Sequence, residues 1–414
     1  MRLCLLLSTL IASASASRLW ATHYNGHVYT LDLAGNNTLS VTDKLKTCGG
    51  MPSWLTFDAA TRTLYCSDED GSADPSTHGS LTALHAAPDG KLREMVKTEA
   101  VGGGVSSAIY GGKGKGKGKK YLAIAHYGGS AISTFSLPLH PNQRALQAFH
   151  FNLTHAGAVA QQDASHPHEV FLDPTGSFIV SPDLGADLLR VYAIDTSSGR
   201  LHGCPSVNVT FGSGPRHGVF WSDSDGKTGN NGASHNQQPS RRTTTTTTIE
   251  SGKTLLYVAN EIGGTVMVYD VSYPQSGCLS FAKKQTLVPY THGKMPHGAT
   301  PAGIHIVGDA LYVSIRSDQG FAPSDSMVTL DRSARNGSVA LRTRTPAYGK
   351  VPRTFALNRA GDLVAIGNQA SATVAVVRRD RRTGELGEKV AVVQVGGPGK
   401  VGAAEGLSSV IWEE

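Results

Sequence analysis

The sequence is short of charge, of aromatic residues and of long apolar runs. Charged residues make up 17% of the 414 residues and aromatic residues 7%, whereas ordinary globular chains have about 25% charged residues. Glycine is abundant, at 48 residues, and each glycine inside a helix costs about 1 kcal/mol. This composition argues against coiled coils and helical bundles. After the first residues no run approaches the ~20 apolar residues of a membrane-spanning helix, and a hydrophobic content of 39% excludes wholesale disorder.

Residues 1–17 are predicted to be a signal peptide. Met1 and Arg2 form a short basic start, residues 3–12 are an apolar run, and residues 13–17 are small side chains suited to a peptidase. The alternative is a buried first strand. We therefore expect a secreted, extracellular protein whose mature chain begins near Ser17 or Arg18.

The excess of positive charge is concentrated in two low-complexity stretches. The net charge is +6, and the basic residues gather in a Gly-Lys run within residues 111–120 and in a Thr-rich stretch within residues 222–252. Nucleic-acid binding needs basic residues spread over a face with aromatic residues between them. We expect flexible basic loops instead, and no nucleic-acid or membrane partner.

An internal repeat carries the fold prediction. A short apolar segment recurs seven times, at 54–57, 108–110, 169–172, 218–221, 303–306, 354–357 and 408–412. A second strand-like segment belongs to each unit, at 19–22, 64–67, 121–125, 178–181, 255–259, 311–314 and 363–367. A third, alternating strand and a more polar fourth strand follow, the fourth for example at 201–211 or 388–395.

Seven units of four strands predict an all-β fold, a seven-bladed β-propeller with antiparallel four-stranded blades. The chain enters in the second strand of a unit and ends, at 406–412, in a first strand. We expect this C-terminal strand to complete the N-terminal blade and close the ring, because closure leaves no open sheet edge. One domain then covers residues 18–414, with insertions at 111–120 and 222–252. A two-sheet sandwich is the alternative fold.

Four cysteines remain after removal of the signal peptide, and they allow three disulfide pairings. Cys204 and Cys278 each follow a glycine at corresponding places in successive repeats, and Cys48 and Cys66 flank the strand at 54–57. These positions favour Cys204–Cys278 and Cys48–Cys66. Glycosylation is expected at N-x-Ser/Thr triplets, namely Asn36, Asn152, Asn208 and Asn336.

One face of such a ring collects the chemically useful side chains. In an antiparallel blade, the start of the first strand and the end of the second lie on the same face, here called the mouth. The first strands start at Ser53, His168, Arg216, His217 and Arg353, and the second strands end at His23, Asp68, Glu69, His126, Asp183, Asn260, Glu261, Arg316, Asn368 and Gln369. A ring of histidine, arginine and carboxylate groups suits a small anionic ligand. The alternative is that these residues cap the blades. Both insertions are expected on the opposite face.

Several fragments at the mouth resemble a known family. They are His-Pro-His-Glu-Val-Phe-Leu-Asp-Pro-Thr-Gly at 166–176, Pro-Asp-Leu-Gly-Ala-Asp at 182–187, Gly-Pro-Arg-His at 214–217, Tyr-Val-Ala-Asn-Glu at 257–261 and Val-Pro-Arg-Thr-Phe at 351–355. In order and spacing they resemble the seven-bladed lactonase family, which includes bacterial 6-phosphogluconolactonases and fungal carboxy-cis,cis-muconate cyclases.

The resemblance implies a catalytic set of His168, Arg216, Glu261 and Arg316. We further predict substrate-binding residues at the mouth, namely His126, Asp183, His217, Arg353 and Asn368.

The expected function is lactone-ring chemistry on a small acidic or sugar-derived molecule. The resemblance allows hydrolysis of a lactone, or formation of one by a cyclase. Export argues against a phosphorylated, intracellular substrate. No cofactor and no metal are expected: the histidines of His166-Pro167-His168 are a weak metal signal alone, and Walker A, G-x-S-x-G and H-E-x-x-H patterns are absent. The rival from another class is a secreted propeller that binds without catalysis.

Overall fold

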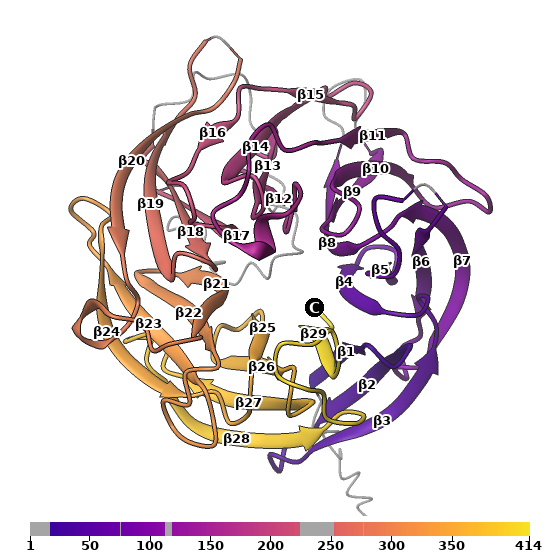
Figure 1. The fold of residues 1–414 in the computed structure, drawn as a ribbon. Coiled ribbons are helices and arrows are strands. Elements are labelled where there is room, and N and C mark those ends of the chain that lie inside the picture. The colour runs from indigo at the N-terminus through magenta and orange to yellow at the C-terminus, as the bar shows by residue number, and fades with distance from the viewer. Residues whose placement is uncertain (1–16, 75, 112–117, 224–251, 276) are drawn as a thin grey trace, which may run out of the picture.

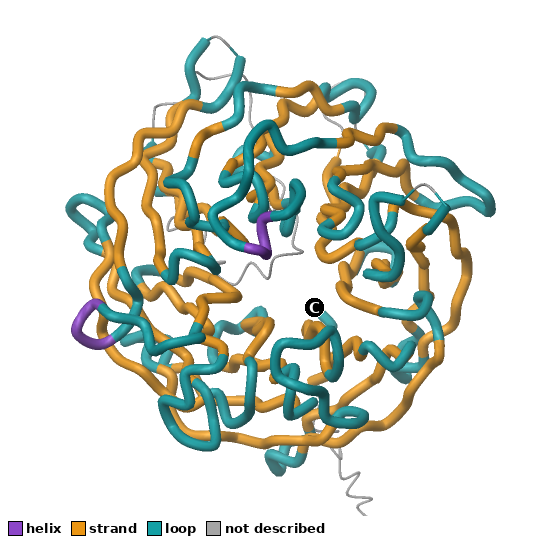
Figure 2. Tube along the Cα trace, viewed as in Figure 1, coloured by secondary structure: helices purple, strands orange, loops and turns teal. Residues whose placement is uncertain are grey.

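Seven antiparallel sheets stand around a central channel in the computed structural model, which describes residues 17–74, 76–111, 118–223, 252–275 and 277–414 (Figure 1). Each sheet is a blade of four strands, which are consecutive in six blades, while the first blade takes its innermost strand from the C-terminal end of the chain. Blade 4 also carries a short fifth strand. The tube view shows strands throughout the ring, joined by loops (Figure 2). Helical structure in the described residues is limited to two short turns. The seven-bladed propeller predicted from the repeat is confirmed. Residues 1–16 of the predicted signal peptide and the interiors of both insertions lie outside the described residues.

The blades are numbered 1 to 7 along the chain, and their strands are as follows. The innermost strands are β29 (Leu407–Trp412), β4 (Pro52–Asp58), β8 (Gly104–Gly111), β12 (Phe171–Leu172), β17 (Pro215–Ser222), β21 (Thr300–Val307) and β25 (Pro352–Leu357). The second strands are β1 (Ser17–His23), β5 (Thr63–Asp68), β9 (Lys120–His126), β13 (Phe178–Asp183), β18 (Thr254–Asn260), β22 (Ala310–Arg316) and β26 (Leu363–Asn368).

The outer halves of the blades follow the same order. The third strands are β2 (His27–Leu33), β6 (His78–Ala86), β10 (Ala131–Leu137), β14 (Leu188–Ile194), β19 (Thr265–Ser272), β23 (Ser326–Arg332) and β27 (Thr373–Arg379). The outermost strands are β3 (Leu39–Lys46), β7 (Leu92–Val101), β11 (Gln147–His150), β15 (Leu201–Gly203) with β16 (Val207–Asn208), β20 (Ser280–Leu287), β24 (Val339–Pro346) and β28 (Leu386–Gln394). The helical turns are η2 (Ala160–Gln162) and η4 (Thr291–Gly293).

The ring is closed by the two ends of the described chain. Strand β29 pairs with β1 in antiparallel register, with Leu19 opposite Trp412. The indole N–H of Trp412 also donates to the carbonyl of Ala356 in blade 7 (2.9 Å), so the last strand ties blade 1 to its neighbour. The expected closure by the C-terminal strand is confirmed.

The core lies between the blades. Seven clusters of buried apolar side chains are found among the described residues, and each joins one pair of adjacent blades. Strand β18 shows how the sequence builds this arrangement. Leu255 and Tyr257 pack toward blade 6, whereas Leu256 and Val258 pack toward blade 4, because successive strand side chains face opposite sides of the sheet.

Both expected disulfides are present. Cys48 bonds to Cys66 and Cys204 bonds to Cys278, with Cα–Cα distances of 5.8 and 5.7 Å. The predicted fourth strand at 201–211 was wrong in its continuity, since it is split into β15 and β16 around Cys204 and Pro205. Pro205 has no N–H for the ladder, and the disulfide holds Cys204 toward blade 5.

The insertions branch from the predicted places. Gly111, the last residue of β8, pairs with Lys120, the first residue of β9, and Ser222, the last residue of β17, pairs with Thr254, the first residue of β18. These are the ends opposite the mouth. Among the described residues, no helix is long and apolar enough to cross a membrane.

Candidate functional site

A repeated irregularity at the start of the innermost strands aims side chains into the mouth. Pro215 pairs with Asn260, and Pro352 pairs with Asn368, but the register shifts immediately after each proline. The extra residues of these β-bulges are Arg216 and Arg353. Because a bulge interrupts the ladder and turns a side chain away from its regular direction, both arginines can leave the sheet and point to the channel.

Glu261 lies directly after β18 and bridges two arginines. Its Oε2 is 2.8 Å from Nε of Arg216, and its Oε1 contacts a terminal nitrogen of Arg316. Arg316, the last residue of β22, also donates through Nε and Nη2 to Oγ1 of Thr300 (3.1 and 2.9 Å). Burial alone would raise the pKa of Glu261, but the Arg316 and Arg216 charges outweigh it and hold the pKa below its ordinary value. Glu261 is therefore ionised at neutral pH.

Arg216 is the most deeply buried member of this group. Its side chain is 1% exposed, against 23% for Glu261 and 14% for Arg316. Burial, followed by repulsion from Arg316, lowers the pKa of Arg216 to about 9. The guanidinium still carries its charge at neutral pH, and Glu261 is the carboxylate that balances it.

A second carboxylate, Glu69, lies directly after β5 and gathers three donors. Its Oε2 accepts hydrogen bonds from Tyr24 Oη (2.5 Å), Ser53 Oγ (2.6 Å) and Arg353 Nη2 (3.3 Å). Ser53 is itself the bulge residue of β4, and Tyr24 follows β1. The mouth thus holds two carboxylate groups, each bound to arginine, on different blades.

His168 stands among these charges without joining an ion pair in the described structure. Its backbone N–H donates to the carbonyl of Pro182 (2.9 Å), and its ring centre is 5.2 Å from that of His217. Burial and then the positive charges of Arg216 and Arg353 lower the pKa of His168 well below its ordinary 6.5. A neutral imidazole at this position can accept a proton.

The ring of Tyr127 lies between His166 and His168, and His166 is itself fixed by hydrogen bonds. The Tyr127 ring stacks on His166, with centres 4.1 Å apart and planes 8° from parallel, and meets the ring of His168 edge-on at 5.6 Å. The His166 ring is fixed on both sides, to the carbonyl of Tyr127 and to Oδ1 of Asp163 (2.8 Å each). Burial, then the charges of Glu261 and Asp163, raise the pKa of Tyr127 to about 12, so the phenol remains a donor.

Glu169 and His217 form a buried pair, and each is the residue that follows a mouth residue in the sequence. Glu169 follows His168, and His217 follows Arg216, and Oε1 of Glu169 is 3.5 Å from Nδ1 of His217. The other oxygen of Glu169 accepts the backbone N–H of Gly218 (2.7 Å). Burial raises the pKa of Glu169 to about 8. The pair links blades 4 and 5 directly beneath His168 and Arg216.

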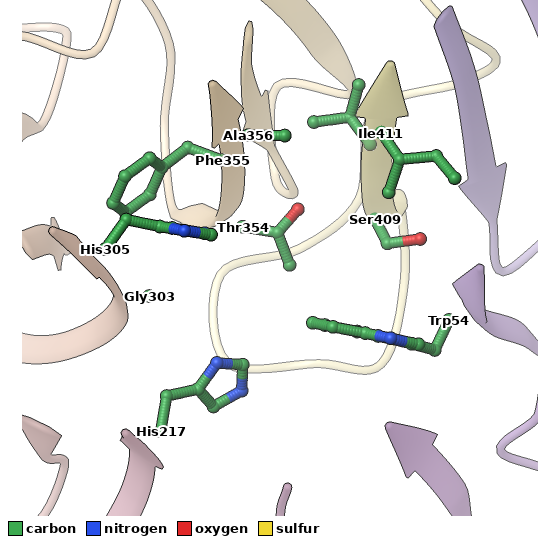
Figure 3. A pocket seen from close by; sticks show the side chains of 10 residues that line it. Trp54, His217, Gly303, His305, Thr354, Phe355, Ala356, Ser409 and Ile411 are labelled. Carbon is green, nitrogen blue, oxygen red and sulfur yellow. The ribbon is translucent and has the colours of Figure 1, made fainter. Parts of the chain in front are cut away.

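The channel below the mouth contains a small cavity of about 20 Å³ (Figure 3), room for roughly one water molecule. Its lining is Trp54, His217, Gly303, His305, Thr354, Phe355, Ala356, Ser409, Val410 and Ile411. His305 packs edge-on against Phe355, with ring centres 4.7 Å apart, and burial lowers its pKa to about 4.

Three of the predicted substrate-binding residues are held by hydrogen bonds within the protein. His126 is fully buried and bonds through Nε2 to Ser133 Oγ (2.7 Å). Asp183 is fully buried, accepts the backbone N–H of His166 (2.8 Å) and pairs with Arg190. Asn368 donates to the carbonyl of Ala347 (3.0 Å). Their polar atoms hold the mouth loops in place, so the structure does not bring them to the Glu261 cluster. His217 and Arg353, by contrast, lie beside His168 and Glu69.

Two tyrosines of the mouth were missed by the sequence analysis. Tyr24 and Tyr127 each follow a histidine that ends a second strand, and this repeated His-Tyr pair was the available signal. Among the described residues there is no group of three or more His, Cys, Asp and Glu side chains that could hold a metal ion.

Comparison with known proteins gives a consistent result. The family model "Lactonase, 7-bladed beta-propeller" matches residues 18–403. A probable 6-phosphogluconolactonase of Arthroderma benhamiae is 26% identical over 362 residues, covering 86% of this chain and 78% of the relative. A 6-phosphogluconolactonase of Formosa agariphila is 26% identical over 317 residues, covering 75% and 77%. The solved periplasmic gluconolactonase PpgL of Pseudomonas aeruginosa superimposes with a TM-score of 0.71 at 23% identity, covering 96% of this chain and 99% of PpgL.

Proposed function

Because the chain belongs to the lactonase family of seven-bladed β-propellers, we propose that it is an exported enzyme that hydrolyses the ring ester of a small, sugar-derived lactone. The observation that carries the proposal is the cluster of Glu261, Arg216 and Arg316 beside a neutral His168 at the mouth. It combines a proton acceptor with cations that can stabilise a negatively charged oxygen.

The reaction needs one proton acceptor and one anion-stabilising group. Water attacks the carbonyl carbon of the lactone while His168 accepts the proton from that water. The carbonyl oxygen becomes negatively charged, and the guanidinium groups of Arg216 and Arg316 stabilise it. When the ring C–O bond breaks, the leaving alkoxide takes the proton back from His168. The product is a hydroxy acid. Glu261 keeps Arg216 and Arg316 in position throughout.

The charge of the mouth favours hydrolysis of a neutral lactone over cyclisation of a polycarboxylate. Three arginines (Arg216, Arg316 and Arg353) face two carboxylates (Glu69 and Glu261), so the net charge of these five groups is 3 − 2 = +1. One surplus charge matches the single negative charge that develops on a lactone carbonyl. A carboxymuconate, with three carboxylates, would place further negative charge next to Glu69 and Glu261.

The substrate we propose carries no phosphate. The relatives from Arthroderma and Formosa are named for 6-phosphogluconolactone, which is an intracellular sugar phosphate. Residues 1–17 have the layout of a signal peptide, and two disulfides are typical of oxidising compartments. Both features support export. N-terminal sequencing of protein recovered from the culture medium should find a start near Ser17 or Arg18.

The test is a pH-stat assay of acid release from D-glucono-1,5-lactone. His168→Ala and Glu261→Gln should each lose about 10²- to 10⁴-fold in kcat, whereas Glu388→Gln, an 80% exposed carboxylate on β28, should match the wild type. Glu261→Gln also leaves the buried Arg216 without its charge partner, which typically costs about 3–5 kcal/mol of stability, so thermal melting accompanies each assay. Full activity in both site variants would contradict the catalytic role, and a wild type inactive on a panel of lactones would favour the non-catalytic binding protein.

A further inference from the structure

We infer that Glu69 is a specificity-determining residue that binds a substrate hydroxyl group, so that polyhydroxylated lactones are preferred over lactones without hydroxyl groups. The inference rests on the proposed function and adds a second half-site to it. Tyr24, Ser53, Glu69 and Arg353 form this half-site, here called the Glu69 subsite.

The hydrogen bonds of Glu69 are strongly uneven. All three donors, from Tyr24, Ser53 and Arg353, reach Oε2. No hydrogen bond to Oε1 is found within the part of the chain that the structure describes. An ionised carboxylate can accept about four hydrogen bonds over its two oxygens. The Glu69 side chain is 18% exposed, so Glu69 is fixed through one oxygen while part of its side chain remains accessible to solvent.

The subsite belongs to the same mouth as Glu261. Its residues come from blades 1, 2 and 7, while Arg216, Glu261 and Arg316 come from blades 5 and 6. Tyr127, from blade 3, lies near both, since the charges of Glu261 and of Glu69 each contribute to its raised pKa. One small molecule at the mouth can therefore meet Glu261 and its arginines at one end and the Glu69 subsite at the other.

Hydroxyl groups are the ligands that this subsite can bind. A hydroxyl group donates to a carboxylate oxygen and accepts from a guanidinium N–H, and Glu69 and Arg353 offer these partners side by side. A substrate carboxylate would meet the negative charge of Glu69 instead, and an apolar substituent would leave Oε1 without a partner in a partly buried place. Leaving such a group unpaired is what allows a site to reject an analogue that lacks a hydroxyl.

The experiment compares two lactones with six-membered rings. D-Glucono-1,5-lactone carries hydroxyl groups and δ-valerolactone has none. We expect Glu69→Gln to lower the ratio of their kcat/KM values by about ten- to hundred-fold, the range for a hydrogen bond to a charged group. Glu99→Gln is the matched control, because Glu99 lies on β7 of the same blade with a side chain that is 70% exposed; its ratio should equal that of the wild type.

The outcomes separate the two proposals. A wild type that hydrolyses lactones, with an unchanged ratio in folded Glu69→Gln, overturns the role of Glu69 and leaves the proposed function standing. A wild type that hydrolyses neither lactone overturns the proposed function and the Glu69 subsite with it. If Glu69→Gln does not fold, the wild type is assayed with gluconolactones that lack one hydroxyl group at a time. Loss of one particular hydroxyl should then cause most of the loss in kcat/KM, and equal kcat/KM for all of them overturns the inference.

Discussion

Single charges at the mouth determine whether His168 can act as a base. Its pKa is well below 6.5 because burial disfavours the charged ring and because Arg216 and Arg353 repel a proton. His168 stays neutral at every pH above its lowered pKa. It is protonated, and can no longer act as a base, only when the pH falls below that lowered pKa. We therefore expect kcat/KM for lactone hydrolysis to stay level as the pH falls from about 8 past 6.5, and to drop at lower pH.

A variant tests the cause of this lowered pKa. Arg353→Gln removes one repelling charge, so the pKa of His168 should rise and the acidic limb of the pH–rate profile should move to higher pH. Arg200→Gln, at an exposed turn of blade 4, should leave the profile unchanged. An acidic limb at or above pH 6.5 in the wild type would show that His168 is not the base that controls the rate.

Glu169 should make the stability of the protein fall as the pH rises, whereas the activity that depends on His168 falls as the pH is lowered. Burial raises the pKa of Glu169 to about 8 in the folded chain, against an ordinary 4.5. A group with a raised folded pKa contributes its full stability below the unfolded pKa, and that contribution is lost as the pH rises through the folded pKa. As the pH rises from about 5 to about 9, the wild type should therefore lose free energy of unfolding relative to Glu169→Gln, which has no carboxyl group to ionise at this position. Urea titrations at the two pH values measure it, and an equal difference at both would refute the assignment.

Tyr127 should act through its hydroxyl and not through its ring. In Tyr127→Phe the stacking on His166 is retained, while a hydroxyl donor within reach of the charges of Glu261 and Glu69 is removed. We expect kcat/KM to fall about ten-fold, the value of one hydrogen bond, with little change in melting temperature. Tyr257→Phe is the converse control, since its hydroxyl donates to the carbonyl of Gly337 (2.9 Å) away from the mouth; it should lose stability and keep its kcat/KM. Wild-type kinetics in Tyr127→Phe would exclude a role for the hydroxyl.

At the scale of strands, the sequence predicted the positions of the strands, which depend on local alternation. It did not predict the lengths and breaks of strands that depend on contacts with the adjacent blade. Alternating apolar residues placed the strands, and their repetition placed Arg216 and Glu261 on one face. The length of β12, only Phe171–Leu172, was not predictable, because Glu169 beside it bonds across to Gly218 in the next blade. The split of β15 from β16 was signalled by Pro205 but depends on the disulfide partner Cys278.

The two insertions should be dispensable for the fold, because the residues on either side of each insertion are already paired. The first insertion joins paired residues Gly111 and Lys120, and the second lies between Asp223 and Lys253, whose backbone groups are bonded (3.1 Å). Replacing residues 112–119 and 224–252 each by Asn-Gly, the preferred two-residue hairpin turn, should keep the fold and the activity. Circular dichroism and the lactone assay check this. Loss of activity in a folded variant would mean that an insertion reaches the site, contrary to its predicted face.

At the scale of the whole molecule, the site forms only when the ring is assembled, because its residues come from several blades. Arg216, Arg316 and Arg353 come from three successive blades, and Glu69 and Tyr24 come from two others. The repeat predicted that the charged residues at these strand ends share the mouth, but it missed Tyr24 and Tyr127. It could not predict which side chains pair, because the Arg316–Glu261 and Arg353–Glu69 contacts depend on the rotation between blades. For the same reason the repeat could not predict that His126, Asp183 and Asn368 form hydrogen bonds with Ser133, His166 and Ala347.

Deletion of the last ten residues, 405–414, should unfold the whole ring. It removes β29, whose Leu407, Val410 and Trp412 belong to the cluster between blades 1 and 7 and whose Ile411 belongs to the cluster between blades 1 and 2. Each buried side chain contributes roughly 1.5–3 kcal/mol, so these four together approach the ~5–15 kcal/mol by which a domain is stable. The deletion also exposes the ladder of β1. We expect no cooperative melting transition and no lactone hydrolysis in the truncated chain.

A circular permutant separates loss of the strand from loss of the chain end. The backbone N–H of Glu413 donates to the carbonyl of Arg18 (2.9 Å), so a short turn can join residue 414 to residue 17. New ends can be placed within residues 224–251, in the second insertion. This permutant keeps every strand and should melt cooperatively with the activity of the wild type. A truncated chain that melts like the wild type would show that β1 does not need β29, and would contradict closure of the ring as the source of its stability.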